Sequence, residues 1–281
     1  MKKIKNKLLN YKKNILFIFL ILLVSNIYAS SNIEERIDEN FNSDISLITN
    51  IYTSDNIAGR FDSYKIAITW TEGFCYTNPE KPECNNISDK INKDFNYAMT
   101  LHGLWPNDGA RIDYGYCTEA SFSKYNEEAL NHLLLDYYMP SVNYPEIQGF
   151  YLARHEWDKH GICQKVWNQA EYYYISTKII GVFRDTFLID LKDKNMISKE
   201  QLYLELSSKF PNISAKNIDL KCDKNTRNIL QEIRISLSKD LEKLDSQEWR
   251  NINIELLSKY LTNNKSPYDN CDDNLILKPY N

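Results

Sequence analysis

The alternation of hydrophobic and polar positions predicts several β-strands that are separated along the chain by helices. Residues 64–71 (YKIAITWT) alternate and are rich in β-forming side chains, so we expect a strand that enters the core. A second short strand is expected over residues 97–102 (YAMTLH), ending at Gly103 and Pro106. Two later segments show the same pattern, residues 219–222 and residues 232–237 (EIRISL).

Helical spacing is found over residues 127–138 and 169–191. Strands and helices follow one another without a regular β-α-β alternation, and no internal repeat is visible. We therefore predict a single α+β domain with a central, mostly antiparallel sheet and helices packed on it. The composition agrees, since the 281 residues are 43% hydrophobic and 13% aromatic with only 8 Gly and 8 Pro, which is typical of a folded protein with one sizeable core.

The first 30 residues have the plan of a secretory signal peptide. Six lysines and no acidic residue precede or flank an apolar run at residues 15–24, which small and polar residues follow. The run is shorter than the about 20 residues that a membrane-spanning helix needs, so we expect no membrane segment after removal of the signal. An uncleaved signal anchor is the alternative. Residues 31–60 are polar and rich in Asn and Asp, and we interpret them as an N-terminal extension or linker.

The charge balance changes the expected mode of ligand binding. The chain has 34 basic residues, six of them in the signal segment, and 38 acidic residues, so the rest carries a formal charge of −10. An acidic protein does not attract nucleic acid by its overall field, and any attraction to a polyanion must be local.

Cysteine use indicates an oxidising compartment. A signal peptide followed by six cysteines favours a disulfide framework. The sequence has no CxxC motif, which weighs against a zinc ribbon or a thioredoxin-like redox site. A cysteine nucleophile is a less favoured alternative. The cysteines are Cys75, Cys84, Cys117, Cys163, Cys222 and Cys271.

Three of the four histidines lie in two short segments, LHGLWPN (101–107) and RHEWDKHGIC (154–163), whereas His132 lies in a leucine-rich run where packing or solvent exposure is expected. At about 100° per residue, one helix face can gather two histidines, a carboxylate and an ammonium. These four residues are His155, Glu156, Lys159 and His160. A solvated, charged helix face is the structural alternative.

Several imidazoles beside a carboxylate and an ammonium suit proton transfer on a negatively charged intermediate. RNA transesterification requires this, because the ribose 2′-hydroxyl is the nucleophile and needs one base and one acid. The segment HEWDKH is one residue longer than the zinc-protease pattern HExxH, and Lys159 would repel a cation. A zinc site of His102, His155 and His160 is therefore the less favoured alternative, and we expect no metal and no cofactor.

The two histidine segments together resemble the signature segments of the ribonuclease T2 family, which comprises secreted, metal-independent endoribonucleases. SYKIAITWTEGFCY and EIRISL resemble the first core strand and the late strand of that family. The resemblance covers residues 61–281, which we interpret as the catalytic domain, and looks most similar to bacterial members.

The resemblance implies a role for each matched residue. His160 would be the general base and His102 the general acid, while Glu156 and Lys159 would stabilise the pentavalent phosphorus species and His155 would hold the phosphate. Three further residues are candidates for binding a base, namely Trp105, Asn107 and Tyr114. Trp105 could instead be a core residue, and Asn107 stands where many relatives carry Asp. The implied disulfides are Cys75–Cys84, Cys117–Cys163 and Cys222–Cys271.

The resulting hypothesis is a secreted or periplasmic, monomeric endoribonuclease that acts on single-stranded RNA through a 2′,3′-cyclic phosphate and does not cleave DNA. Two alternatives remain. One is a catalytically silent RNA-binding or signalling protein of the same fold. The other is a toxin or partner-binding role of residues 31–60 in addition to ribonuclease activity.

Overall fold

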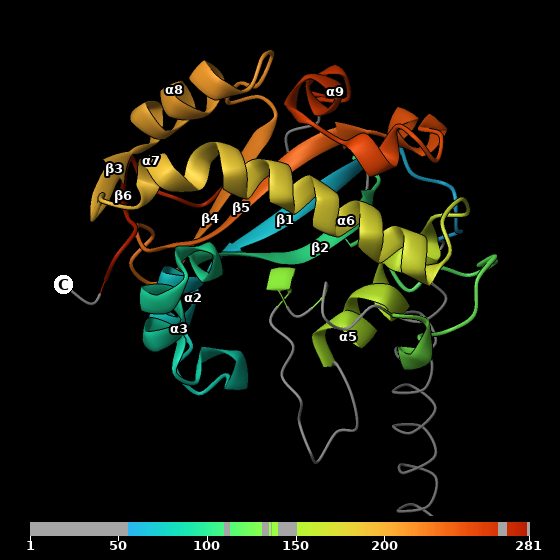
Figure 1. Cartoon of the computed structure of the whole chain (residues 1–281), viewed down its shortest axis with the longest axis horizontal. Helices are drawn as coiled ribbons and strands as arrows, with labels where there is room; N and C mark the ends of the chain where they lie inside the picture. Colours follow the sequence, from blue (N-terminus) through green and yellow to red (C-terminus); the bar gives the residue numbers. More distant parts are fainter. Residues whose placement is uncertain are drawn as a thin grey trace, which may run out of the picture. The chain divides into compact units, whose positions relative to one another are not determined.

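The computed structural model describes residues 56–109, 113–130, 135, 137–139, 151–263 and 269–279 (Figure 1). The predicted signal peptide, residues 31–55 and His132 lie outside this part of the chain. A compact unit covers Asp55–Asn281. Residues just before the expected domain start at residue 61 are joined to it, because Asn56 Nδ2 donates to the Gly115 carbonyl over 2.9 Å and the Gly59 amide donates to the Cys163 carbonyl over 2.7 Å.

The described strands are β1 (Ser63–Trp70), β2 (Met99–Asn107), β3 (Met196–Ser198), β4 (Ile218–Cys222), β5 (Leu230–Ser238) and β6 (Asn274–Ile276). The described α-helices are α2 (Thr71–Thr77), α3 (Ile87–Lys93), α5 (Tyr151–Lys159), α6 (Gln169–Phe183), α7 (Ile189–Leu191), α8 (Lys199–Lys209) and α9 (Ile254–Lys259). A π-helical turn, Arg184–Leu188, joins α6 to α7.

The main sheet has four strands in the order β2-β1-β5-β4, and every neighbouring pair is antiparallel. A separate antiparallel pair is formed by β3 and β6. The prediction of an α+β domain with an antiparallel sheet is therefore confirmed. The predicted strands at 64–71, 219–222 and 232–237 correspond to β1, β4 and β5.

The two faces of the main sheet differ in chemistry. One face carries Ile66 of β1 between its register partners Leu104 of β2 and Ile235 of β5, all fully buried. Helix α6 packs across this apolar face, as Figure 1 shows, and the Tyr172 hydroxyl donates to the Leu104 carbonyl over 2.5 Å. Alternation then places the intervening residues, many of them charged, on the opposite face. That polar face carries the candidate site.

Helix α6 begins where the predicted helix 169–191 begins. Asn168 and Glu171 form a capping box, in which each side chain accepts from the other residue's backbone amide. The predicted helix continues through the π-helical turn into α7 and ends at Leu191 as expected. Of the helix predicted over 127–138, the described part begins with a 3₁₀ turn at Glu127–Ala129.

The prediction that the second strand ends at Gly103 is wrong, because β2 continues to Asn107. β2 is an edge strand, where a proline such as Pro106 is tolerated. Its pairing also contains a bulge: Gly103 pairs with Ala67, but Ile68 pairs with Leu101, so His102 is the extra residue. Bulges redirect side chains, and here the bulge lets His102 and Gly103 both face the polar side.

Three disulfides join Cys75 to Cys84, Cys117 to Cys163, and Cys222 to Cys271. These are the pairs that the family resemblance implies. Cys117–Cys163 links the loop after β2 to the turn that follows α5. Within the described residues, no helix has both the length and the apolar character needed to cross a membrane.

Candidate active site

A cleft of about 840 Å³ opens on the polar face of the main sheet. Residues of β1, β2, β4, β5 and α5 line it, together with the loop after β2. All of the predicted catalytic, phosphate-binding and base-binding residues border this one cleft, namely His102, Trp105, Asn107, Tyr114, His155, Glu156, Lys159 and His160. The structure thus brings together two segments that are about 50 residues apart in the chain.

Helix α5 supplies three of these residues, namely His155, Glu156 and Lys159. It ends at Lys159, and His160 follows in the first turn after the helix. Glu156 is buried in the cleft floor, at 1% exposure. Trp157 points away from the cleft, as the helical geometry predicted, and its Nε1 donates to the Ser123 carbonyl over 2.9 Å. The helix therefore has one face in the core and another in the cleft.

His102 lies between two carboxylates. Its Nδ1 is 2.5 Å from Glu232 Oε2, and its Nε2 is 3.4 Å from Glu156 Oε1. Burial alone would lower the pKa of His102, but the two carboxylates outweigh it and raise the pKa above the ordinary histidine value. The ring therefore holds its proton to higher pH than a free imidazole does.

His160 has the opposite electrostatic environment. It is 9% exposed, and burial together with the positive charges of Lys159 and His102 lowers its pKa well below the ordinary value. Its Nδ1 is buried and bonds to no group within the described part of the chain. The imidazole is therefore neutral, and able to accept a proton, at pH values where His102 is still protonated.

Trp105 connects the two histidines. Its ring stacks on His160 with centroids 5.1 Å apart and meets the His102 ring edge-on at the same distance. Its Nε1 donates to Glu156 Oε2 over 2.6 Å, and the Arg234 guanidinium lies 5.0 Å from the ring centroid. These contacts favour a role in holding the two histidines and Glu156 over the predicted role as a stacking surface for a base.

Gly103 is required by this packing. A Cβ at position 103 would lie 2.3 Å from Glu156 Oε2 and 2.4 Å from Trp105 Nε1. Both distances are far below contact distance, so any side chain would separate Trp105 from Glu156. The glycine of the first histidine segment thus allows the bond between them.

His155 and Lys159 lie on the outer part of the cleft. Burial and the neighbouring Lys159 ammonium lower the pKa of His155. Two exposed tyrosines accompany it, since the Tyr151 ring stacks at 6.4 Å and the Tyr116 ring meets it edge-on at 6.5 Å. Lys159 Nζ lies 6.0 Å from the Tyr116 ring centroid. Sequence analysis did not select either tyrosine.

Asn107 and Tyr114, the other two predicted base-binding residues, also border the cleft. Asn107 Nδ2 donates to Ser63 Oγ over 3.2 Å. Tyr114 is 5% exposed, and its hydroxyl donates to the Ile57 carbonyl over 2.6 Å. The hydroxyl of Tyr114 is thus engaged within the fold, whereas Asn107 at the end of β2 is more accessible.

The sheet also contributes charged residues that were not predicted from the sequence. Glu232 and Arg234 of β5 contact His102 and Trp105, although the segment EIRISL was interpreted only as a strand. A buried pair, Lys65 and Asp219, lies on the same face, with Nζ and Oδ2 2.5 Å apart. The presence of charged residues at alternate positions of a predicted core strand was the signal from which Glu232 and Arg234 could have been predicted as site residues.

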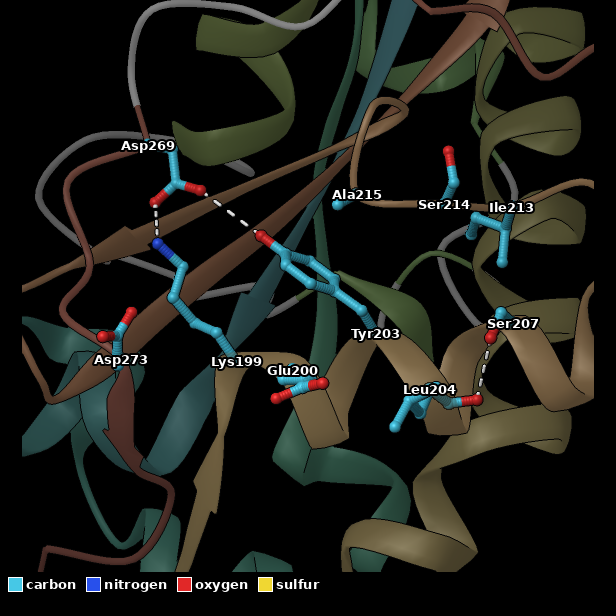
Figure 2. A pocket seen from close by; sticks show the side chains of 10 residues that line it. All are labelled: Lys199, Glu200, Tyr203, Leu204, Ser207, Ile213, Ser214, Ala215, Asp269 and Asp273. Atoms are coloured by element: carbon cyan, nitrogen blue, oxygen red, sulfur yellow. Dashed lines mark hydrogen bonds and ion pairs between the residues drawn. The ribbon is translucent and has the colours of Figure 1, made fainter.

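A second cavity, of about 510 Å³, lies beside α8 and contains none of the predicted residues (Figure 2). Lys199 Nζ forms an ion pair with Asp269 Oδ1 over 2.8 Å there, and the Tyr203 hydroxyl approaches Asp269 Oδ2 at 3.4 Å. No histidine lines it. Among the described residues, no group of three or more His, Cys, Asp or Glu side chains is arranged to hold a metal ion.

Comparison with known proteins relates most of the domain to one family. The model of the Ribonuclease T2 family matches residues 61–247. Ribonuclease S-3 of Petunia hybrida is 24% identical over 193 residues, which cover 66% of this chain and 81% of that protein. A ribonuclease of Aeromonas hydrophila is 27% identical over 123 residues, which cover 42% of this chain and 45% of that protein. The expectation of a special similarity to bacterial members is therefore not supported.

Solved structures show the same fold. Ribonuclease MC1 from the seeds of bitter gourd has a TM-score of 0.51 and 19% identity, and the match covers 77% of this chain and 100% of that chain. A mutant of ribonuclease MC1 in complex with 5′-GMP matches with a TM-score of 0.53.

Proposed function

The chain belongs to the ribonuclease T2 family, and we propose that it is an endoribonuclease that cleaves single-stranded RNA by transesterification. The observation that carries this proposal is the pair His102 and His160. The two rings come from separate segments, border one cleft, and have pKa values displaced in opposite directions. Two titratable groups whose pKa values are displaced in opposite directions can supply one general acid and one general base.

The proposed reaction has no enzyme nucleophile. His160 removes the proton of the ribose 2′-hydroxyl, and the 2′-oxygen forms a bond to phosphorus. The bond between phosphorus and the 5′-oxygen breaks, and His102 gives its proton to that oxygen. The products are a 2′,3′-cyclic phosphate and a 5′-hydroxyl. If the cyclic phosphate is later hydrolysed, the two histidines exchange roles.

The pentavalent phosphorus species carries additional negative charge, and Lys159 on the outer part of the cleft is placed to stabilise it. His155 is proposed to hold a phosphate oxygen beside it. Glu156 is proposed to hold Trp105 and His102 in place, since it is buried, accepts a hydrogen bond from Trp105 and lies near His102. Burial raises the pKa of Glu156, while His102 opposes that effect.

The cleft supplies the local attraction that an acidic protein requires for RNA. Five cationic side chains line it, namely Lys65, Lys159, Lys221, Lys224 and Arg234, against the carboxylates of Asp113 and Glu156. Lys65 and Arg234 form ion pairs with Asp219 and Glu232, so the local attraction rests on Lys159, Lys221 and Lys224. The predicted charge outside the signal segment is negative. RNA is therefore proposed to bind through the cleft and not through the overall field of the protein.

We place the enzyme outside the cytoplasm, as a secreted or periplasmic monomer. Three disulfides support a location outside the cytoplasm, because such bonds persist in oxidising compartments. The predicted signal peptide is consistent with it, although that segment lies outside the described residues.

The ribose requirement gives a direct test of the function. A DNA strand that contains one ribonucleotide is expected to be cut only after that ribonucleotide, in the presence of EDTA, because only it carries a 2′-hydroxyl. Mass spectrometry should find a 2′,3′-cyclic phosphate on one product and a 5′-hydroxyl on the other. Cleavage of an all-DNA strand, or loss of cleavage in EDTA, would contradict the proposal. Binding of RNA by a folded protein without cleavage would favour the silent alternative.

The opposite pKa displacements predict a bell-shaped dependence of kcat/KM on pH. His160 must be neutral, and its lowered pKa places the acidic limb below the ordinary histidine value of about 6.5. His102 must be protonated, and its raised pKa places the alkaline limb above that value. Activity should therefore be highest from mildly acidic to near-neutral pH. Initial rates across this range measure it, and a single limb that tracks only one titration would contradict it.

A further inference from the structure

We propose that Glu232, held in place by Arg234, is a positioning residue that fixes the His102 ring and maintains it as the general acid. This inference rests on the proposed function, because it concerns the acid of that reaction. It adds two residues of β5 that neither histidine segment contains.

The register of the sheet brings these residues to His102. Glu232 pairs with Thr69 of β1, and Arg234 pairs with Ala67, whose partner on β2 is Gly103. All of these positions face the polar side of the sheet. Since His102 is the bulged residue next to Gly103, its side chain reaches across to the strand beyond β1.

Both carboxylate oxygens of Glu232 are engaged. Oε2 lies 2.5 Å from His102 Nδ1, and Oε1 accepts from Arg234 Nε. The Glu232 side chain is 5% exposed and that of Arg234 is 14% exposed. A carboxylate bonded at both oxygens and surrounded by protein has little freedom to rotate. It therefore holds the imidazole in one orientation.

That orientation decides which proton is transferred. Nδ1 donates to Glu232, so the proton available to the leaving oxygen is the one on Nε2. Nε2 is 3.4 Å from Glu156 Oε1, which is longer than a normal hydrogen bond, and the His102 side chain is 31% exposed. The Nε2 proton can thus reach a substrate in the cleft.

The charges around His102 favour the protonated ring. Glu232 and Glu156 face it with negative charge, while burial and the positive charge of Arg234 oppose protonation. The imidazoles of His155 and His160 also lie nearby, and the charge of His102 lowers their pKa values. Burial alone would raise the pKa of Glu232, but His102 and Arg234 hold it at about 2. Glu232 is therefore ionised throughout the pH range in which the enzyme would work, and Arg234 is bonded to it instead of lying free beside His102.

Glu232→Gln removes the charge while its amide oxygen can still accept from Nδ1, although its amide nitrogen cannot accept from Arg234 Nε. We expect the alkaline limb of the pH profile to move to lower pH. At neutral pH, kcat/KM for RNA should fall about tenfold or more, up to the roughly 10⁴-fold that a general acid contributes. A nucleoside 3′-(4-nitrophenyl phosphate), whose leaving group needs no proton, should be cleaved by parent and variant at similar rates.

Glu242→Gln is the matched control. Glu242 is a partly buried carboxylate that accepts from the Tyr64 hydroxyl over 2.8 Å and does not line the cleft. It should leave both limbs of the profile unchanged. An alkaline limb that stays in place in Glu232→Gln, or equal losses on both substrates, would overturn the proposal.

Titration of His102 by NMR in ¹⁵N-histidine-labelled protein gives a readout that does not need activity. The pKa of His102 should be lower in Glu232→Gln than in the parent, and an unchanged pKa would overturn the inference. If Glu232→Gln does not fold, Glu232→Asp keeps the charge but draws it away from Nδ1, so the pKa of His102 should again be lower than in the parent, and an unchanged pKa would overturn the inference. Failure of the parent to cleave RNA would instead refute the proposed function, so the two failures are distinguishable.

Discussion

Replacing His160 with alanine is expected to lower kcat/KM for RNA cleavage by about 10²- to 10⁴-fold, the usual contribution of one general base. His160 is the histidine with the strongly lowered pKa, and thus the ring that is neutral while His102 is protonated. The measurement is the initial rate on single-stranded RNA in EDTA. Circular dichroism and thermal unfolding should show that the variant keeps its fold.

His132→Ala is the matched control for this substitution, because it removes the one histidine that lies outside both histidine segments. It should retain parental activity. The substrate with the 4-nitrophenyl leaving group distinguishes the two catalytic histidines. His160→Ala should lose activity on it as well, since the 2′-hydroxyl must still be deprotonated, whereas His102→Ala should lose activity mainly on RNA. Equal retention of activity by His160→Ala and His132→Ala would refute the role of His160.

Prediction of the fold from the sequence was most successful where one face of an element is buried. β1, β4 and β5 alternate, and α6 has a capping box and helical spacing, so each pattern has one structural solution. The strand predicted for β2 was too short, because Gly and Pro residues such as Gly103 and Pro106 usually end strands. An edge position and a bulge at His102 overrode those local signals, and both depend on pairing with β1, which the residues of β2 alone do not reveal.

The candidate site was predicted to the extent that it is local in sequence. His155, Glu156 and His160 lie within one helical turn and the residue after it, so helical geometry relates them directly. The bond between His102 and Glu232 joins residues 130 positions apart. It depends on β5 pairing with β1 in one register, and a single sequence does not specify that register. The same limit applies to Trp105, since its contacts with His160 and Arg234 depend on how α5 packs against β2 and how β5 pairs with β1.

The polar face of the sheet carries the candidate site, and it also has buried charged residues, which is unusual for a sheet of this kind. Ordinary sheets of this kind expose their polar face to water, but here the side chains of Lys65, Asp219 and Glu232 are at most 5% exposed. Burial of ionic groups is costly unless each has a partner. The pairing of these charges therefore couples the stability of the sheet to the placement of the groups that surround His102.

Asp219→Ala is accordingly expected to destabilise the protein by about 3–5 kcal/mol at neutral pH, because it removes the carboxylate partner of a buried ammonium. Lys65 Nζ would keep the Ser236 hydroxyl at 3.1 Å but lose Asp219 Oδ2 at 2.5 Å. Burial lowers the pKa of Lys65 and Asp219 opposes that effect, so the variant should lower this pKa further. The loss of stability should therefore shrink as pH rises towards the ordinary pKa of lysine, because Lys65 then releases its proton in the unfolded chain as well.

Urea unfolding with the disulfides intact measures this loss, and an exposed ion pair provides its control. Lys209 and Asp190 lie 3.3 Å apart with side chains 45% and 34% exposed, so Asp190→Ala should cost no more than about 1 kcal/mol. The double variant Lys65→Met with Asp219→Leu should recover most of the stability, since an apolar pair needs no partner charge. A cost for Asp219→Ala no larger than that for Asp190→Ala would show that the Lys65 ammonium is solvated, and that the polar face is open to water instead of being held by paired charges.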